Sequence, residues 1–244
     1  MKNFTFILFL LVSSYANENV NTISTEEKSP IKEEELFDPL SGYNKIMTSF
    51  NDQFFMNVLN PISKGYAYIT PETMRIGISN FFENIMFPVR FSNNLLQLKF
   101  KNANEELGRF TINTFWGLGG FMDPATNELN MTPHKEDFGQ TLGFYGIGDG
   151  FPVVLPILGQ SNLRDMVGLG ADSYVSALST TGDSDLNYKI PNNFEQELGI
   201  KSFEMINSTS LKLGQYETIR KDGTDLYPLL RDIYAKSRKK QIEE

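Results

Sequence analysis

A stretch rich in glycine and proline in the middle of the chain limits the fold more than any other feature. Within residues 117–159 these two residue types occupy the positions Gly117, Gly119, Gly120, Gly139, Gly143, Gly146, Gly148, Gly150 and Gly159, and Pro124, Pro133, Pro152 and Pro156. Glycine loses much conformational freedom in a helix, and proline lacks a backbone donor, so a long regular helix cannot persist here. We expect loops and turns in this region and regular elements on either side.

The segment before the glycines carries helical patterns. Over 43–59 apolar side chains recur at spacings of three and four, which predicts one helical face made of Met47, Phe50, Phe54 and Val58. Asn60-Pro61 is expected to end that helix.

A second helix is predicted to start at Thr70-Pro71-Glu72, with Thr70 as N-cap and Pro71 at the first helical position. Its apolar face is expected to consist of Ile78, Phe81, Phe82 and Ile85. Pro88 is expected to close it, and further helical stretches are predicted over 91–100 and from 103 to about 116.

Two more helical patterns follow the glycine-rich stretch. The first contains Leu163, Met166, Val167 and Tyr174, and the second contains Leu226, Leu229, Leu230, Ile233 and Tyr234. Lys236, Arg238, Lys239 and Lys240 are expected in the last turns of the final helix, where cations suit the helix dipole. The fold class predicted is mainly α, as a single domain over 37–240 with a tail at 241–244.

The first residues resemble a secretory signal peptide. Lys2 precedes an apolar run over 4–12, and Ser13, Ser14 and Ala16 supply the small residues of a cleavage site, so we expect a signal peptide over 1–16. The run is far shorter than the roughly 20 residues that a membrane-spanning helix needs, and no later stretch is closer to that length. Residues 17–36 are polar and acidic, which is typical of a flexible arm.

Composition excludes several kinds of function. The chain contains no cysteine, so a disulfide or a thiolate metal site is excluded. Its formal net charge of −8 argues against a nucleic-acid partner, because binding phosphates requires clustered Lys and Arg. We expect no metal and no cofactor.

The sequence offers little catalytic chemistry. His134 is the single histidine, and its Pro133-His134-Lys135 setting favours a loop or capping role. An exported hydrolase that uses His134 with a nearby Ser or Asp is the weaker alternative. The glycines of 146–150 lack the other residues of a nucleotide-binding motif and predict turns with positive φ. Asp137, Asp149 and Asp165, like Glu136, are expected to serve as caps and ion-pair partners. The protein is therefore expected not to be an enzyme.

The 20 phenylalanines gather mainly before the glycines and leave apolar side chains on more than one helical face. The residues concerned are Phe50, Phe54, Phe55, Phe81, Phe82, Phe87 and Phe91. A helix that is apolar beyond one stripe is either fully buried or in contact with lipid, and both readings remain open from the pattern alone.

Four sequence blocks together resemble the MlaA (VacJ) family of outer-membrane proteins. The entry block is Asp38-Pro39-Leu40-Ser41-Gly42-Tyr43-Asn44-Lys45. The second block is Arg109-Phe110-Thr111-Ile112-Asn113-Thr114, followed by Gly117, Gly119, Gly120 and Asp123. The third runs from Asp137-Phe138-Gly139-Gln140-Thr141-Leu142-Gly143 through Gly146, Gly148, Gly150, Pro152, Leu155 and Pro156 to Arg164-Asp165. The last is Asp225-Leu226-Tyr227-Pro228 with Arg231 and Tyr234, in which Pro and Tyr are exchanged relative to the family.

This resemblance implies a ring-shaped protein of short amphipathic helices in the inner leaflet of the outer membrane. Mislocalised phospholipid would pass from the outer leaflet through an amphipathic channel in the ring, which maintains lipid asymmetry. The implied partners are phospholipid, an outer-membrane porin trimer and a periplasmic lipid carrier. As membrane-contacting residues we expect Phe50, Phe54, Phe81, Phe82, Phe87 and Phe91. As channel or hinge residues we expect Asn113, Gly117, Gly119, Gly120, Gly143, Gly146 and Gly148.

The chain departs from the family at the expected cleavage site. The family typically carries a lipidated cysteine there, whereas Ala16 is followed by Asn17. Membrane attachment is therefore expected to depend on the helices alone. A soluble periplasmic lipid-binding or scaffold protein of the same fold is the alternative.

Overall fold

The computed structural model describes residues 37–182, 188–222 and 225–244, and it is mainly helical. The predicted signal peptide and the whole of the predicted acidic arm lie outside the described residues. The elements before the loop-rich centre are α2 (Ser41–Phe54), the π-helical turn η1 (Phe55–Leu59), α3 (Asn60–Ile69), α4 (Glu72–Ile85), α5 (Phe87–Leu96) and α6 (Phe100–Phe115). The remaining elements are α7 (Pro124–Asn127), α8 (Phe138–Phe144), β1 (Pro152–Leu155), β2 (Gly159–Asn162), α9 (Leu163–Val175), α10 (Phe194–Leu211), α11 (Gln215–Asp222) and α12 (Leu226–Glu243).

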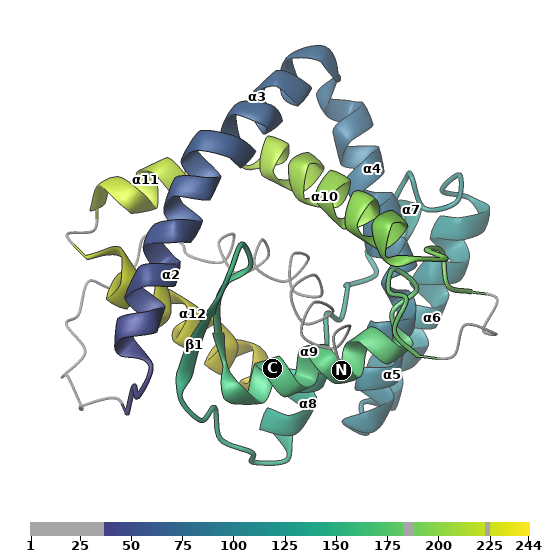
Figure 1. Cartoon of the computed structure of the whole chain (residues 1–244). Coiled ribbons are helices and arrows are strands. Elements are labelled where there is room, and N and C mark those ends of the chain that lie inside the picture. Colours follow the sequence, from purple (N-terminus) through teal and green to yellow (C-terminus); the bar gives the residue numbers. More distant parts are fainter. Residues whose placement is uncertain (1–36, 183–187, 223–224) are drawn as a thin grey trace.

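The helices are arranged as a ring (Figure 1). One side consists of α2 and α3, α4 continues from the top, α5 and α6 form the opposite side, and α8, α9 and α12 complete the lower part. Helix α10 lies inside this outline and packs on both α3 and α4. The two strands form an antiparallel hairpin that rises beside α2, with Pro152 opposite Asn162 and Leu155 opposite Gly159.

The first helix does not end at Asn60-Pro61, so that prediction was wrong. Backbone angles remain helical at Leu59 and Asn60, and α2, η1 and α3 run on as one helix. Pro61 has no N–H, and its ring would meet the carbonyl of Asn57 in a regular α-helix. Asn57 lies within η1, where backbone bonds span five residues. The wider π turn therefore accommodates the proline.

The boundaries around α4 also differ from the prediction. Thr70 is extended, with φ −114° and ψ 119°, and it ends α3, so Pro71 rather than Thr70 is the N-cap of α4. A residue before proline is pushed out of the helical region, which explains the shift by one residue. Pro88 lies in the first turn of α5 and not at the end of α4, which stops at Ile85. Proline suits a first turn because its missing donor has no intrahelical partner there.

The loop-rich centre is confirmed, but it also contains a hairpin that the sequence pattern did not indicate. Gly159 has a φ of +86°, which only glycine adopts without strain, and it follows the tight turn between the strands. Val153, Leu155 and Leu158 of the hairpin pack with Leu169 of α9 in a small apolar core. The hairpin is thereby fixed to α9.

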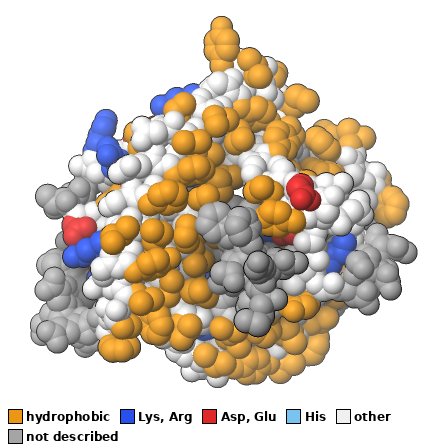
Figure 2. All heavy atoms as spheres, viewed as in Figure 1, with side chains coloured by type: hydrophobic (Ala, Val, Ile, Leu, Met, Phe, Trp, Pro, Cys, Tyr) orange, Lys and Arg blue, Asp and Glu red, His pale blue; other side chains and the backbone are white. Residues whose placement is uncertain are grey.

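The distribution of polar and apolar side chains is the reverse of that in most soluble domains. Among the described residues, 29 polar or charged side chains are buried against 12 hydrophobic ones. Many large hydrophobic side chains are exposed instead, and Tyr68, Phe115 and Trp116 are 92%, 77% and 71% exposed. Figure 2 shows hydrophobic side chains along α2 and α3 and over the lower edge of the ring. An apolar exterior of this extent requires a partner surface or lipid.

Candidate functional site: a polar pocket inside the ring

Three clusters of buried polar side chains hold the ring together, and the first joins its beginning, middle and end. Asn44 of α2 donates from Nδ2 to the carbonyl oxygen of Pro152 at 3.0 Å and accepts from the N–H of Val154 at 2.8 Å. The Asn44 amide also donates to Asp38 and to the Tyr227 hydroxyl. Tyr227 in turn donates to Asp38. The first and last sequence blocks are thus fastened to the hairpin.

The second cluster fixes the turn after α6. Arg109 donates to Asp123 at 3.1 Å and to the carbonyl oxygen of Met131 at 2.6 Å. Asn113 donates to Asp123 at 2.8 Å and accepts from the N–H of Ala125. Asp123 also caps α7 through the N–H of Thr126. Asn113, which we expected in a channel or hinge, therefore holds α7 against α6.

The glycines 117–120 lie in this same turn. A Cβ on Gly117 would lie 2.4 Å from the carbonyl oxygens of Asn113 and Met122, so no larger residue fits without moving the backbone. Gly120 has a φ of +99°, and its Cβ would meet the side chain of Asn84 at 2.6 Å. Gly119 also has positive φ, at +75°, but faces open space. Two of the three glycines are thus required by close packing.

The third cluster lies where α8, α9 and α12 meet. Arg238 donates to Asp137 from both terminal nitrogens, at 2.6 and 2.9 Å. It also donates to Asp165 from Nε at 2.9 Å and from a terminal nitrogen at 3.0 Å. Tyr234 donates to Asp165 at 2.5 Å, and Asp137 caps α8 at the N–H of Gln140. Arg238 lies in the last two turns of α12, as predicted, but its guanidinium is buried in this cluster and not exposed at the helix end.

Two carboxyl groups in and beside this cluster have pKa values shifted in opposite directions, that of Asp165 downward and that of Asp172 upward. Burial alone would raise the pKa of Asp165, but Arg238 and the hydrogen bond from Tyr234 outweigh it and hold that pKa below its ordinary value. Asp172 is buried nearby on α9 and accepts from Asn93 and from the N–H of Phe138. Burial, and then the negative charge of Asp137, raise the pKa of Asp172 to about 7. Asp165 is therefore ionised at neutral pH, while Asp172 changes charge near it.

A pocket opens inside the ring beside this third cluster. Its wall comes from α4, α5, the segment before α8, β2, α9, α10 and α12, and includes Phe82, Glu83, Arg90, Lys135, Asp137, Gln160, Asp165, Asp172, Glu204, Asn207, Lys212, Tyr234 and Arg238. Most of these side chains are polar or charged. The surface that they expose to the pocket is nevertheless mainly apolar, so the pocket is amphipathic. It is the candidate functional site because it places charged groups and apolar surface together inside a ring whose outer surface is apolar.

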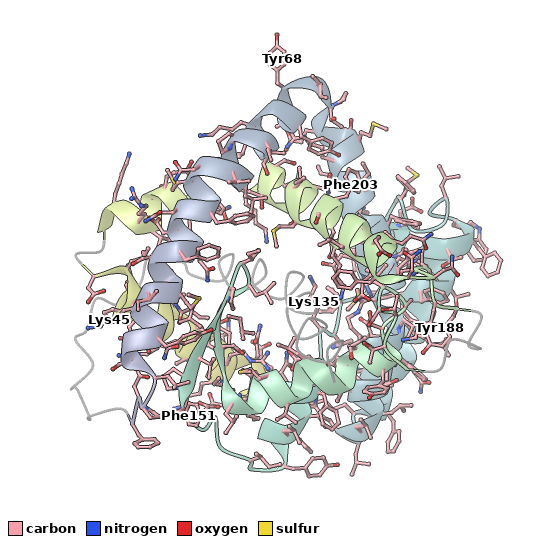
Figure 3. The ribbon with its side chains drawn as sticks, in the orientation of Figure 1. Lys45, Tyr68, Lys135, Phe151, Tyr188 and Phe203 are labelled. Carbon is pink, nitrogen blue, oxygen red and sulfur yellow. The ribbon has the colours of Figure 1, made fainter. Side chains whose placement is uncertain are left out.

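The pocket contains charged residues that the sequence patterns did not single out for this role. Lys135 and Glu83 form an ion pair with 2.7 Å between Nζ and Oε1, and each side chain is 40% exposed. Figure 3 shows Lys135 toward the centre of the ring, whereas Lys45 lies on the outer side of α2. Glu83 is on α4 and Lys135 precedes α8, so 52 residues separate them along the chain. No local spacing could have indicated this pair.

The expected membrane-contacting phenylalanines differ in exposure and fall into three groups. Phe50 is 45% exposed on α2, whereas Phe82 is 6% exposed and contributes to the pocket wall. The others are partly exposed: Phe54, Phe81, Phe87 and Phe91. Phe87 stacks on Phe110 of α6 with 4.4 Å between ring centroids, and Phe81 packs against Phe121 at 5.1 Å. Phe87 thus joins α5 to α6, and Phe81 joins α4 to the turn after α6.

The later glycines lie in and after α8 and are not part of the pocket wall. A Cβ on Gly143 would lie 2.6 Å from the Ile242 side chain of α12. Gly146 has a φ of +82° and Gly150 of +72°, which confirms the predicted turns, while Gly148 faces open space without positive φ. Gly143 therefore permits the approach of α8 to α12.

His134 lies in the loop before α8, which confirms its predicted position. Its N–H donates to Glu106 at 2.7 Å, and its ring nitrogen Nε2 lies 2.6 Å from Glu105. Over the ranges that the structure describes, no group of acidic or histidine side chains is placed to hold a metal ion. Nor does any described helix combine the length and apolarity needed to cross a bilayer.

Comparisons with known proteins agree with the geometry. The sequence model of the family described as MlaA lipoprotein matches residues 36–241. An uncharacterised protein of Rickettsia felis is 30% identical over 209 residues, which is 86% of this chain and 79% of the relative. The intermembrane phospholipid transport system lipoprotein MlaA of Haemophilus influenzae is 34% identical over 179 residues, 71% of this chain and 68% of the relative.

A solved structure is also similar. It was described under the heading "Structural basis for maintenance of bacterial outer membrane lipid asymmetry" and aligns with a TM-score of 0.70 at 29% identity, covering 84% of this chain and 98% of the other. The matched blocks include the Asn44, Arg109 and Asp165 clusters described above. The chain therefore belongs to the MlaA lipoprotein family.

Proposed function

We propose that the protein transports phospholipid at the outer membrane, removing misplaced molecules from the outer leaflet through the inside of its ring. The observation that supports this most directly is the combination of an apolar outer surface with an internal pocket that contains charged groups. The exterior suits acyl chains, because apolar surface is stabilised outside water. The interior suits a polar head group, which loses hydrogen bonds when it enters a purely apolar space.

The proposed partners are phospholipid, a porin trimer around the ring, and a periplasmic lipid carrier that receives the lipid. They come from the family and from the phospholipid transport system named for the Haemophilus relative. The exposed aromatic side chains Phe115 and Trp116 and the exposed Phe50 supply apolar surface for contact with the membrane or a porin. The proposal includes no chemical step, so the protein acts as a transporter and not as an enzyme.

The turn glycines are proposed to let the pocket change shape. Gly119 and Gly146 have positive φ, and a Cβ added to either would have no neighbouring atom within 4 Å, so valine there strains the backbone without a steric collision. We expect Gly119→Val and Gly146→Val to reduce lipid clearance while the amount of exported protein is unchanged. Unchanged outer-leaflet phospholipid in both variants would contradict the hinge role.

The transport function is tested in a deletion strain of a bacterium that exports this chain. Outer-leaflet phospholipid should rise on deletion and return to the parental amount when the gene is restored. A strain with normal outer-leaflet phospholipid after deletion, with no related gene expressed, would contradict the proposal. His134→Ala should clear lipid normally, because its ring contacts Glu105 away from the pocket wall.

Membrane residence is tested by fractionation. The protein should stay with the outer membrane after a carbonate wash, because its exposed apolar side chains each favour an apolar surround by up to about 1.5–3 kcal/mol. Release into the periplasmic fluid favours the alternative, a soluble lipid-binding or scaffold protein of the same fold.

A further inference from the structure

The ion pair between Glu83 and Lys135 differs from the other charged contacts around the pocket. The Arg238 cluster is buried, with side chains between 5% and 7% exposed. Glu83 and Lys135 are each 40% exposed on the pocket wall. An exposed ion pair is weak, because water screens it and two long side chains lose freedom. Water and a charged ligand can therefore both reach the two charged groups from the pocket.

The backbone that carries Lys135 is held firmly on both sides. The N–H of His134 donates to the buried Glu106, and the carbonyl oxygen of His134 accepts from Asn94. The carboxylate of Glu136 accepts from Lys99 and from Gln97, each at 2.7 Å. Lys135 is thus presented from a fixed segment, which reduces the ordering needed for a ligand to bind.

Glu83 is held from the other side by Arg90. The Arg90 guanidinium donates to the carbonyl oxygen of Glu83 at 2.7 Å and lies 3.6 Å from its carboxylate. Arg90 is itself paired with Glu106 at 2.7 Å. The wall therefore presents the Glu83 carboxylate and the Lys135 ammonium side by side on backbone segments that are held in place. A ligand with one positive and one negative charge complements this pair.

The charges of the whole pocket wall, Glu83 and Lys135 included, favour a ligand with no net charge over an anion. Among the described residues that form its wall, six are carboxylic acids and four are Lys or Arg. With Asp172 protonated, the negative charges still outnumber the positive ones. A net negative wall disfavours an anionic head group, whereas a zwitterion brings its own ammonium.

We propose that Glu83 and Lys135 form a binding site for the head group of a zwitterionic aminophospholipid. The Lys135 ammonium donates to a phosphodiester oxygen, and the ligand ammonium donates to the Glu83 carboxylate. Each contact is a charge-assisted hydrogen bond, and together they replace the ion pair between the two side chains. This inference deepens the proposed transport function and rests on it.

The test compares two short-chain lipids with equal acyl chains, dihexanoyl phosphatidylethanolamine and dihexanoyl phosphatidylglycerol. Binding to the full chain, purified in an uncharged detergent, is measured by titration calorimetry. The wild-type protein should bind the ethanolamine lipid more tightly. Lys135→Gln should weaken binding of both lipids about tenfold, because both carry the phosphodiester. Lys135→Arg should retain the affinity of the wild type within about threefold.

Glu83→Gln separates a head-group site from a general effect of charge. It should weaken the ethanolamine lipid about tenfold and leave the glycerol lipid within about twofold, since only the former has an ammonium. Matched controls are Lys45→Gln on α2 and Glu72→Gln on α4, both exposed and away from the pocket wall. Equal effects of Glu83→Gln on both lipids, or no effect of either pocket variant, would overturn the site.

Failure of the head-group site is distinguishable from failure of transport. If the wild type binds both lipids and restores outer-leaflet asymmetry while the two pocket variants behave like the controls, only the site is wrong. If the wild type binds neither lipid and fails to restore asymmetry, the transport function itself is wrong. Thermal unfolding of every variant shows whether a loss of binding reflects a loss of fold.

Discussion

Two sides of the ring differ in how completely their buried polar groups are hydrogen-bonded. Where α8, α9 and α12 meet, every guanidinium nitrogen of Arg238 is engaged by Asp137 or Asp165. Where α10 packs on α3, Ser63 Oγ and Thr209 Oγ1 are buried without a hydrogen-bond partner among the described residues. A buried guanidinium whose nitrogens are all engaged is costly to remove, although one nitrogen of the neighbouring Arg164 has no partner among the described residues. Unsatisfied hydroxyls weaken the contact that contains them. The ring is therefore held more firmly at α12 than at α10.

The largest expected effect comes from breaking the firm side. Arg238→Met leaves the buried Asp137 without its cation and Asp165 with Arg164 alone, at 3.1 Å, and should lower the free energy of unfolding by about 3–5 kcal/mol. Denaturant unfolding of the purified protein measures this. Lys239→Met is the matched control, because Lys239 is the next residue of α12 and its side chain is 77% exposed. A loss for Arg238→Met no larger than that of the control contradicts the comparison.

A smaller effect is expected from the close contact of α8 with α9. A Cβ on Gly168 would lie 2.4 Å from the backbone nitrogen of Gly139, so Gly168→Ala must push the helices apart. Overpacking of this kind costs about 1–3 kcal/mol. Gly170 lies on the same helix with nothing within 4 Å, so Gly170→Ala should instead stabilise by about 0.5–1 kcal/mol. Thermal unfolding should show shifts of opposite sign.

The firm side should also respond to pH through Asp172. Its pKa is raised to about 7, so the folded protein binds this proton more tightly than the unfolded chain does. The stabilisation is complete below about pH 4, the unfolded value, and is lost as the pH rises through about 7. The free energy of unfolding of the wild type, relative to Asp172→Asn, should fall by about 1–2 kcal/mol between pH 5 and pH 8.

Asp165 does not obscure that measurement. Its pKa is lowered in the folded protein, so its contribution is present above about pH 4 and is lost only as the pH falls further. An equal difference between wild type and Asp172→Asn at pH 5 and pH 8 means that Asp172 does not titrate in this range.

The smallest effect is expected at α10. Thr209→Val removes an unsatisfied buried hydroxyl with little change in shape and should raise the free energy of unfolding by about 0.5–1 kcal/mol. Ser210 is the matched control, because its hydroxyl donates to the carbonyl oxygen of Asn207 at 2.6 Å. Ser210→Ala should lower stability by about 1 kcal/mol. Chemical denaturation of both variants tests whether the Thr209 hydroxyl is buried without a hydrogen bond while the Ser210 hydroxyl makes a stabilising one.

The sequence predicted helices well where apolar side chains gather on one face, and it missed α10 because its apolar side chains are spread around the helix. Glu197, Lys201 and Asn207 are buried on α10, and Lys201 pairs with Glu197 at 2.8 Å. An apolar stripe is the usual sign of a packed helix, and here the stripe is absent. The hairpin was missed for a related reason, since its short strands contain Pro152 and Gly159, which normally mark turns.

The candidate site was predictable only in part. The roles of Asp137 as a cap and Asp165 as an ion-pair partner are confirmed. Their common partner Arg238 lies 101 and 73 residues further along the chain, so no local pattern connects them. The phenylalanine stripes indicated apolar helices correctly, but periodicity does not separate the pocket-lining Phe82 from the exposed Phe50.

The passage of the first helix through Pro61 has a mechanical consequence. Because the π turn η1 accommodates Pro61, Ser41–Ile69 forms one continuous helix ~43 Å long, at 1.5 Å per residue. Its N-terminal part, α2, contacts β1 and α12, and its C-terminal part, α3, contacts α10. Helix α10 and the β1–α12 side of the protein are therefore connected through one continuous helix, and a bend in that helix is expected at η1, where the π turn interrupts the regular hydrogen-bond pattern.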